Sequence, residues 1–95
     1  MLTSKQRAKL RAIAATTETI MQVGKGGIND NLITQTEDAL RAREIVKYNV
    51  LDSAPCTARE AAEFIAEKTG SEVVQVIGKK LVLFRRNPEN PQIEL

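Results

Sequence analysis

The sequence of 95 residues contains no histidine and a single cysteine, Cys56. Without histidine the chain lacks the commonest metal ligand and general base, which argues against a catalytic zinc, a Ser-His triad or a Cys-His pair. No metal and no cofactor are therefore expected. One cysteine cannot form an internal disulfide and fits a reducing compartment. No apolar run approaches the length of a membrane span, and the N-terminus lacks the apolar middle of a secretory signal, so we expect a cytoplasmic protein without a membrane partner.

Charge of the two signs is nearly balanced, with a net charge of +2, but it is unevenly distributed along the chain. Residues 1–29 hold five cations and one acid, and residues 30–78 hold five cations and nine acids. Residues 79–86 hold four cations and no acid, and the remaining tail holds two acids. If the fold brings the two basic blocks together, the molecule has a positive face for a polyanion and a negative face that keeps it soluble.

Apolar periodicity and capping residues predict the order α-β-α-β-α-β-β. Thr3 with Gln6 and Thr57 with Glu60 can form capping boxes, and Asn29 is a good N-cap. The predicted helices cover residues 4–15, 29–43 and 58–69, and the predicted strands cover 18–23, 44–51, 72–77 and 81–84. This order indicates an α/β (α+β) fold, a compact single domain over residues 1–86 with a four-stranded mixed sheet covered by helices. Residues 87–95 are expected to form an extended or disordered tail.

Two further predictions concern the residues that one helix buries and the position of two strands in the sheet. The helix at 58–69 is expected to bury Ala61, Ala62, Phe64 and Ile65. The strands at 72–77 and 81–84 are almost continuously apolar, which predicts that both are interior strands of the sheet.

Two groups of side chains bear on catalysis. Glu60, Glu63 and Glu67 lie on the outer side of one helix, and paired carboxylates would need a cleft that an exposed helix does not supply. Cys56 precedes the same helix, but with no second cysteine in a Cys-x-x-Cys pair and no histidine base it is more simply a small, buried or half-buried residue than a nucleophile. We therefore do not expect an enzyme.

Residues 22–29 contain three glycines within four positions, between a predicted strand and the start of a predicted helix. Such a junction can hold a phosphate, because glycine permits positive φ and close approach of a ligand, and the helix aims its free N–H groups at the same place. Lys25 adds a charge at the tip, whereas Asp30 in the first helical turn competes with a bound anion. The Gly-x-x-Gly pattern alone is weak, and a flexible turn is the alternative interpretation.

Four segments together resemble the CRM domain family (chloroplast RNA splicing and ribosome maturation), in its single-domain, YhbY-like bacterial form. They are residues 22–27 with 29–31, 43–47, 74–78 and 81–85. The resemblance implies an RNA-binding module that binds precursors of the large ribosomal subunit, with a fold similar to the C-terminal domain of translation initiation factor three. The family's Gly-x-x-Gly loop falls on Gly24 and Gly27. The chain departs from the family at residues 15–19, where relatives usually carry histidine and proline, and at Phe84, where tyrosine is common.

We call residues 24–27 the glycine loop. We predict that this loop binds the sugar-phosphate chain of RNA through main-chain N–H groups, while nearby cations contribute positive charge. The residues expected to bind RNA are Gly24, Lys25, Gly26, Gly27, Lys5, Lys9 and Arg11, and further candidates are Arg7, Asn29, Asn31, Lys79, Lys80, Arg85 and Arg86. Gly27→Asp is expected to leave the fold intact and to weaken binding.

The expected partner is ribosomal RNA in a precursor of the large subunit, bound by a monomer that acts in ribosome assembly. With Phe64 assigned to the core, too few aromatics remain for a sheet that stacks several splayed bases. Recognition through backbone and shape is expected instead. The alternative is a protein-interaction module that docks on a ribosome-associated partner through its acidic helices.

Overall fold

The computed structural model describes residues 2–95, so Met1, the first residue of the predicted domain, lies outside the described residues. Every predicted helix and strand is present, with bounds within one residue of those predicted. The elements are α1 (Ser4–Ala15), β1 (Thr19–Val23), α2 (Asp30–Arg43), β2 (Ile45–Val50), α3 (Ala58–Thr69), β3 (Glu72–Ile77) and β4 (Lys80–Phe84). Both predicted capping boxes form, Asn29 caps α2, and Gly70 ends α3 in the left-handed conformation.

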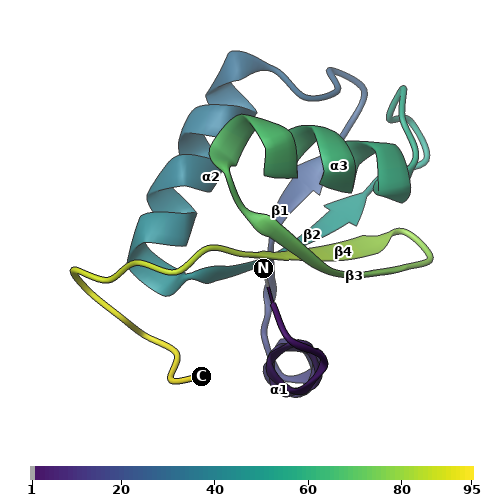
Figure 1. Cartoon of the computed structure of the whole chain (residues 1–95). Coiled ribbons are helices and arrows are strands. Elements are labelled where there is room, and N and C mark those ends of the chain that lie inside the picture. The colour runs from purple at the N-terminus through teal and green to yellow at the C-terminus, as the bar shows by residue number, and fades with distance from the viewer. Residues whose placement is uncertain (1) are drawn as a thin grey trace.

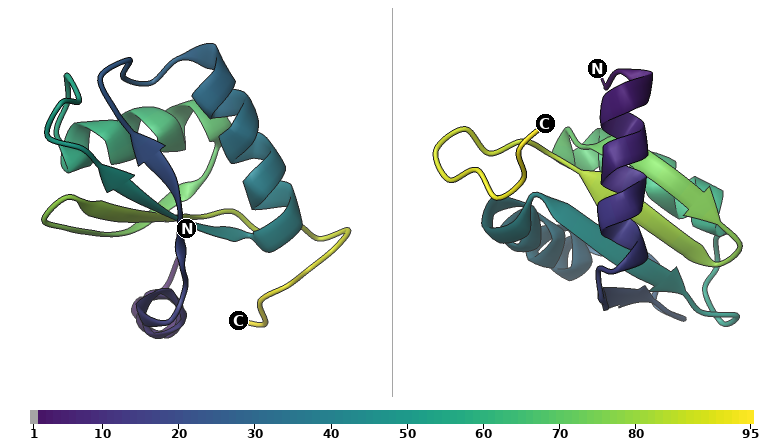
Figure 2. Two further views of the ribbon diagram at one scale, coloured as in Figure 1. Left: turned by 180° about the vertical axis from the view of Figure 1, so that it is seen from behind. Right: turned by 90° about the horizontal axis from the view of Figure 1, so that it is seen from below.

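The four strands form one mixed sheet in the order β1-β2-β4-β3. β1 runs parallel to β2, because α2 carries the chain back between them, whereas β4 runs antiparallel to both β2 and β3. α2 and α3 cover one face of the sheet, and α1 lies alone across the other (Figure 1 and the right view of Figure 2). The predicted α/β fold with a helix-covered mixed sheet is confirmed.

The sheet separates two hydrophobic cores. Leu81 and Leu83 of β4 pack on the side of α2 and α3, whereas the alternating Val82 and Phe84 pack on the side of α1. Because both faces of β4 are covered, its sequence is apolar at successive positions. The prediction that this strand lies in the interior of the sheet is confirmed.

The same prediction is wrong for β3, which forms an edge of the sheet. Val74 belongs to the core under α1, whereas Val73 and Val76 pack against the core under α2 and α3. A run of apolar residues indicates that both faces of a strand are covered. It does not indicate whether the strand is hydrogen-bonded to neighbouring strands on both of its edges.

Phe64 was expected in the core, and this expectation is wrong: its side chain is 45% exposed. The stripe that α3 buries consists of Ala58, Ala61, Ala62, Ile65 and Thr69. Phe64 lies beside this stripe, toward the outer side of the helix. A large aromatic side chain is therefore left at the surface.

The C-terminal segment is irregular, and the structure shows how it is held. It crosses back toward α1 (Figure 1, yellow), and Ile93 joins the core under that helix. Glu44, the fully buried residue between α2 and β2, takes a positive φ of 65° and accepts hydrogen bonds from three backbone N–H groups of the segment. They come from Asn87 at 2.6 Å, Gln92 at 2.6 Å and Ile93 at 2.8 Å.

Candidate functional site

The glycine loop is a tight turn in which the Gly27 N–H donates to the Gly24 carbonyl at 2.9 Å, with Lys25 and Gly26 at the tip. Gly27 has a φ of 67°, and a Cβ atom there would lie 3.1 Å from the Pro55 side chain. By contrast, a Cβ at Gly26 would meet nothing closer than 3.9 Å. Gly27 is therefore required by the fold of the loop, and the expectation that Gly27→Asp leaves the fold intact is not supported by this geometry. Gly26 is the position at which the tip can be altered without strain.

Backbone donors gather beside this turn, where the loop enters α2. The Asn29 side chain caps the helix by accepting from the Leu32 N–H at 2.9 Å. Within residues 2–95, no acceptor takes the backbone N–H groups of Gly26, Asp30 and Asn31. These groups are free to bind an oxygen acceptor from outside the chain, such as a phosphate oxygen.

A shallow depression of about 240 Å³ lies beside these donors, and Gly26 and Asn31 are among its lining residues. It is lined by Gln22, Gly24, Gly26, Gly27, Asn29, Asn31, Leu32 and Gln35. In the described part of the chain, no charged residue lines this depression, and Asp30 lies outside it. Its polar side chains are neutral amides, which can both donate and accept hydrogen bonds. Gln35 was not among the predicted site residues, although its place one helical turn after Asn31 could have revealed it.

A second depression, of about 250 Å³, adjoins the loop and is more apolar. We call it the Phe64 groove, and it is lined by Ile28, Pro55, Cys56, Glu60 and Phe64. Ile28 lies between Gly27 and Asn29 in the chain, so the loop borders both depressions. Burial, with the nearby Glu60 carboxylate, raises the pKa of the Cys56 thiol, so it stays protonated at neutral pH and is a poor nucleophile.

The hairpin between β3 and β4 reaches the same end of the sheet as the glycine loop. The Val50 N–H donates to the Lys79 carbonyl at 2.7 Å, and the Leu51 N–H donates to the Val23 carbonyl at 2.8 Å. The Lys79 side chain forms an ion pair with Asp52. Lys80 lies two residues before Val82 in β4 and therefore points to the same face of the sheet, the one that α1 covers. Its ammonium donates to the Thr19 hydroxyl at 3.3 Å. This basic block is thus split between the loop end and the α1 side.

Helix α1, which carries a group of cations, lies on the other face of the sheet, away from α2 and the loop that precedes α2 (Figure 1). Lys5, Lys9 and Arg11 are exposed, and the Lys9 ammonium donates to the Glu94 carbonyl. Arg7 is half-buried and donates to the carbonyls of Val73 and Val74 on edge strand β3. The structure therefore does not bring the α1 cations and the glycine loop into one patch.

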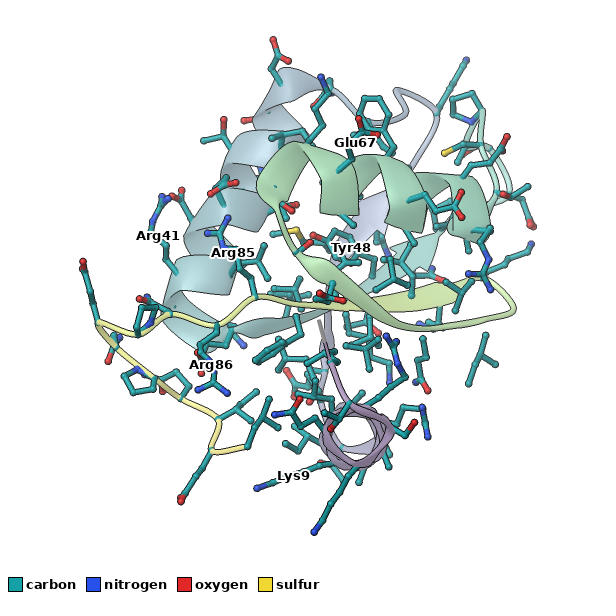
Figure 3. All side chains as sticks on the ribbon, viewed as in Figure 1. Lys9, Arg41, Tyr48, Glu67, Arg85 and Arg86 are labelled. Carbon is teal, nitrogen blue, oxygen red and sulfur yellow. The ribbon has the colours of Figure 1, made fainter. Side chains whose placement is uncertain are left out.

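The last two predicted cations point to different sides of the chain after β4 (Figure 3). Arg85 donates to both carboxylate oxygens of Glu37, at 2.9 and 3.0 Å, and to the Thr69 carbonyl at 2.7 Å. It ties β4 to α2 and α3. Arg86 is exposed and its charge acts on Glu44. Arg85 thus has a structural role that its place in a basic run did not reveal.

The part of the chain that the structure describes contains neither a membrane-spanning helix nor a metal-binding cluster of side chains. Across residues 2–95, no helix is long and apolar enough to cross a membrane. Over the same residues, no three His, Cys, Asp or Glu side chains lie close enough to hold a metal ion.

Comparisons with known proteins agree on one family. The family model of the CRS1 / YhbY (CRM) domain matches residues 2–85. "Probable RNA-binding protein YqeI" of Bacillus subtilis (strain 168) is 45% identical over 95 residues, which cover 100% of this chain and 99% of that protein. An "RNA-binding protein" of Haemophilus influenzae is 28% identical over 88 residues, covering 93% of this chain and 89% of that protein. The solution structure of the hypothetical protein SAV1595 from Staphylococcus aureus superposes with a TM-score of 0.82 at 47% identity, covering 100% of this chain and 99% of that one.

Proposed function

Because the chain belongs to the CRS1 / YhbY (CRM) domain family, we propose that it is an RNA-binding protein whose glycine loop grips the RNA backbone. The names of its relatives in Bacillus subtilis and Haemophilus influenzae support RNA as the ligand. The observation that carries the proposal is the polar depression at the loop, whose lining residues Gly26 and Asn31 have unpaired backbone N–H groups.

A phosphate group in this depression would receive hydrogen bonds from the main chain at the start of α2, where the helix dipole also favours an anion. Lys25 at the tip supplies a mobile positive charge, and the amides of Asn31 and Gln35 can reach sugar or phosphate oxygens. Asp30 opposes the anion, but it does not line the depression. None of these contacts reads a base, so this part of the interface gives affinity without sequence preference.

We propose further that the target is a structured RNA. The exposed cations Lys5, Lys9 and Arg11 lie across the sheet from the glycine loop, so an RNA that meets both must bend around the domain or present two helices. Ribosomal RNA in a precursor of the large subunit is structured and can present two helices in this way. The resemblance of the chain to the YhbY-like proteins is what favours this target and a role in ribosome assembly.

The test compares two substitutions at one position. Gly26→Ala adds a methyl group whose nearest neighbour, the Asn29 amide, is 3.9 Å away, whereas Gly26→Asp places a carboxylate among the N–H donors. We expect Gly26→Ala to bind a structured RNA nearly as the unmodified protein does and Gly26→Asp to bind it at least tenfold more weakly, about 1.4 kcal/mol, at equal folding by circular dichroism. Equal affinities would refute the loop as the grip.

A second measurement addresses the target. The protein is crosslinked to RNA in cells, and the bound fragments are sequenced. Enrichment of large-subunit ribosomal RNA supports the proposed target. Association with large-subunit precursors that survives nuclease treatment would instead support docking on a protein.

A further inference from the structure

The exposed ring of Phe64 lies beside the loop that is proposed to hold the RNA backbone. It stands in the middle of α3, so its Cα position is set by a helix that is packed on the sheet. Within residues 2–95, the large apolar side chains that are exposed are Ile20, Phe64 and Ile77, and Phe64 alone of these lines a depression beside the loop. An exposed aromatic ring on a packed helix, next to a site that binds the RNA backbone, is well placed to stack on a base.

The surroundings of the ring leave one side available. The Lys68 ammonium lies 5.5 Å from the ring centroid, one turn toward the C-terminus of α3. The Phe64 groove lies the other way, bordered by Glu60 one turn toward the N-terminus and by Ile28, which follows the loop. A flat apolar group can therefore enter between Phe64 and Ile28 without displacing the lysine.

The charges select which part of a nucleotide enters. Glu60 is held at the groove by the Thr57 N–H, which donates to its carboxylate at 2.9 Å, and this negative charge repels a phosphate. The neighbouring depression offers the N–H donors and amides that a phosphate needs. The two depressions on the borders of the loop thus suit the two halves of one nucleotide, the phosphate on the polar side and the neutral base on the apolar side.

We propose that Phe64 stacks on one unpaired base of the bound RNA, in the groove that it forms with Ile28 and Pro55. This inference rests on the proposed function, because the base reaches the groove only when its backbone lies on the glycine loop. It also adds selectivity that the loop lacks: RNA with an unpaired base at this point binds better than a continuous duplex. The base can be of any type, since stacking tolerates all of them.

The experiment uses the full chain and two RNA probes, a hairpin with an unpaired loop and a blunt duplex of the same stem. Phe64→Leu keeps an apolar side chain but removes the ring, and Ile77→Ala is the matched control because Ile77 is 65% exposed and does not line the groove. We expect Phe64→Leu to weaken hairpin binding by roughly tenfold and to leave duplex binding unchanged. Ile77→Ala should leave both unchanged.

A fluorescence measurement reports the stacking itself. The chain has no tryptophan, so Phe64→Trp introduces a single indole whose emission belongs to this position. We expect the hairpin to quench this emission and the duplex to leave it nearly unaltered, with hairpin affinity retained or increased.

The outcomes separate the two proposals. If the unmodified protein binds neither probe, the proposed RNA-binding function fails and the stacking inference fails with it. If it binds the hairpin, but Phe64→Leu binds equally well or loses affinity for both probes alike, only the stacking inference is overturned. The groove would then serve another partner, such as an apolar side chain of a protein.

Discussion

The carboxylate of Glu44 accepts a hydrogen bond at 2.8 Å from the backbone N–H of Ile93, a residue 49 positions later in the chain. The same carboxylate also accepts from Asn87 and Gln92, so one buried acid binds the C-terminal segment at three positions. This contact places Ile93 in the core under α1 and thereby joins the segment to the first helix.

Replacing Glu44 tests this connection. Glu44→Gln keeps the size of the side chain but replaces one acceptor oxygen with an NH₂ donor and removes the charge that strengthens all three hydrogen bonds. We expect the free energy of unfolding to fall by about 1.5–3 kcal/mol, measured by urea denaturation. Glu94→Gln, at an exposed acid of the same segment, serves as the control and should change it by less than about 0.5 kcal/mol.

The same carboxylate predicts a pH dependence. Burial by itself raises the pKa of Glu44, but the N–H groups of Asn87, Gln92 and Ile93 and the charge of Arg86 outweigh it and hold the pKa below its ordinary value of 4.5. Because the ionised form is favoured in the fold, its stabilising contribution is complete above about pH 4.5 and is lost as the pH falls toward the folded pKa. Urea denaturation of Glu44→Gln at a series of acidic pH values should show a flatter decline. Parallel declines for the two proteins would contradict this assignment.

Tyr48 offers a second probe, because it is the only tyrosine in the chain. Its hydroxyl is buried and donates to Thr36 at 2.7 Å, and burial raises its pKa to about 12 despite this hydrogen bond. Phenolate absorbance should therefore rise well above pH 10, and stability should fall as the pH increases from about 10 toward 12, since the unfolded chain loses its proton first. Tyr48→Phe should cost about 1 kcal/mol of unfolding free energy. Ionisation near pH 10 in the folded protein would show that the hydroxyl is accessible to water.

The two neighbouring glycines of the loop should respond differently to alanine. Gly27→Ala must adopt a φ of 67° and bring its Cβ to 3.1 Å from Pro55, so we expect a loss of about 1–2 kcal/mol in unfolding free energy. Gly26→Ala meets neither restriction and should be neutral or slightly stabilising, because it restricts the unfolded chain. Thermal and urea denaturation of the pair give the comparison. Equal losses would mean that the turn is not held as described.

Substitutions of Arg11 and Arg85 should have different effects, the first on RNA binding and the second on the stability of the fold. Arg11 is exposed on α1, so Arg11→Ala should weaken RNA binding and reduce the slope of log affinity against log salt by about 1. Arg85 is engaged with Glu37 and Thr69, so Arg85→Ala should instead lower the unfolding free energy by about 1–2 kcal/mol. Arg43→Ala, at an exposed cation outside the predicted set, is the control for binding. An unchanged salt slope in Arg11→Ala would remove α1 from the RNA surface.

What the sequence determined by itself is local. Thr57 and Glu60 are three residues apart and form their capping box with no help from the rest of the fold. The glycine loop is likewise made by neighbours in the chain, and its place between β1 and α2 followed from the apolar residues of β1 and the cap at Asn29. The order of elements, and with it the fold class, could be predicted because each element carries its own periodicity and its own ends.

The tertiary structure alone decided which distant surfaces meet. Periodicity assigned Phe64 to the core because it cannot tell the middle of a buried stripe from its border, which depends on how α3 lies against the sheet. Charge counting could not show that α1 and the glycine loop lie across the sheet from each other, or that Arg85 is committed to Glu37. The contact between Glu44 and Ile93 left no pattern in the sequence, because it joins residues that only the packed sheet brings together. Local hydrogen bonds and periodicity depend on residues that are close in the sequence and can be predicted from it. The contacts of a side chain with distant residues depend on how the elements pack and cannot.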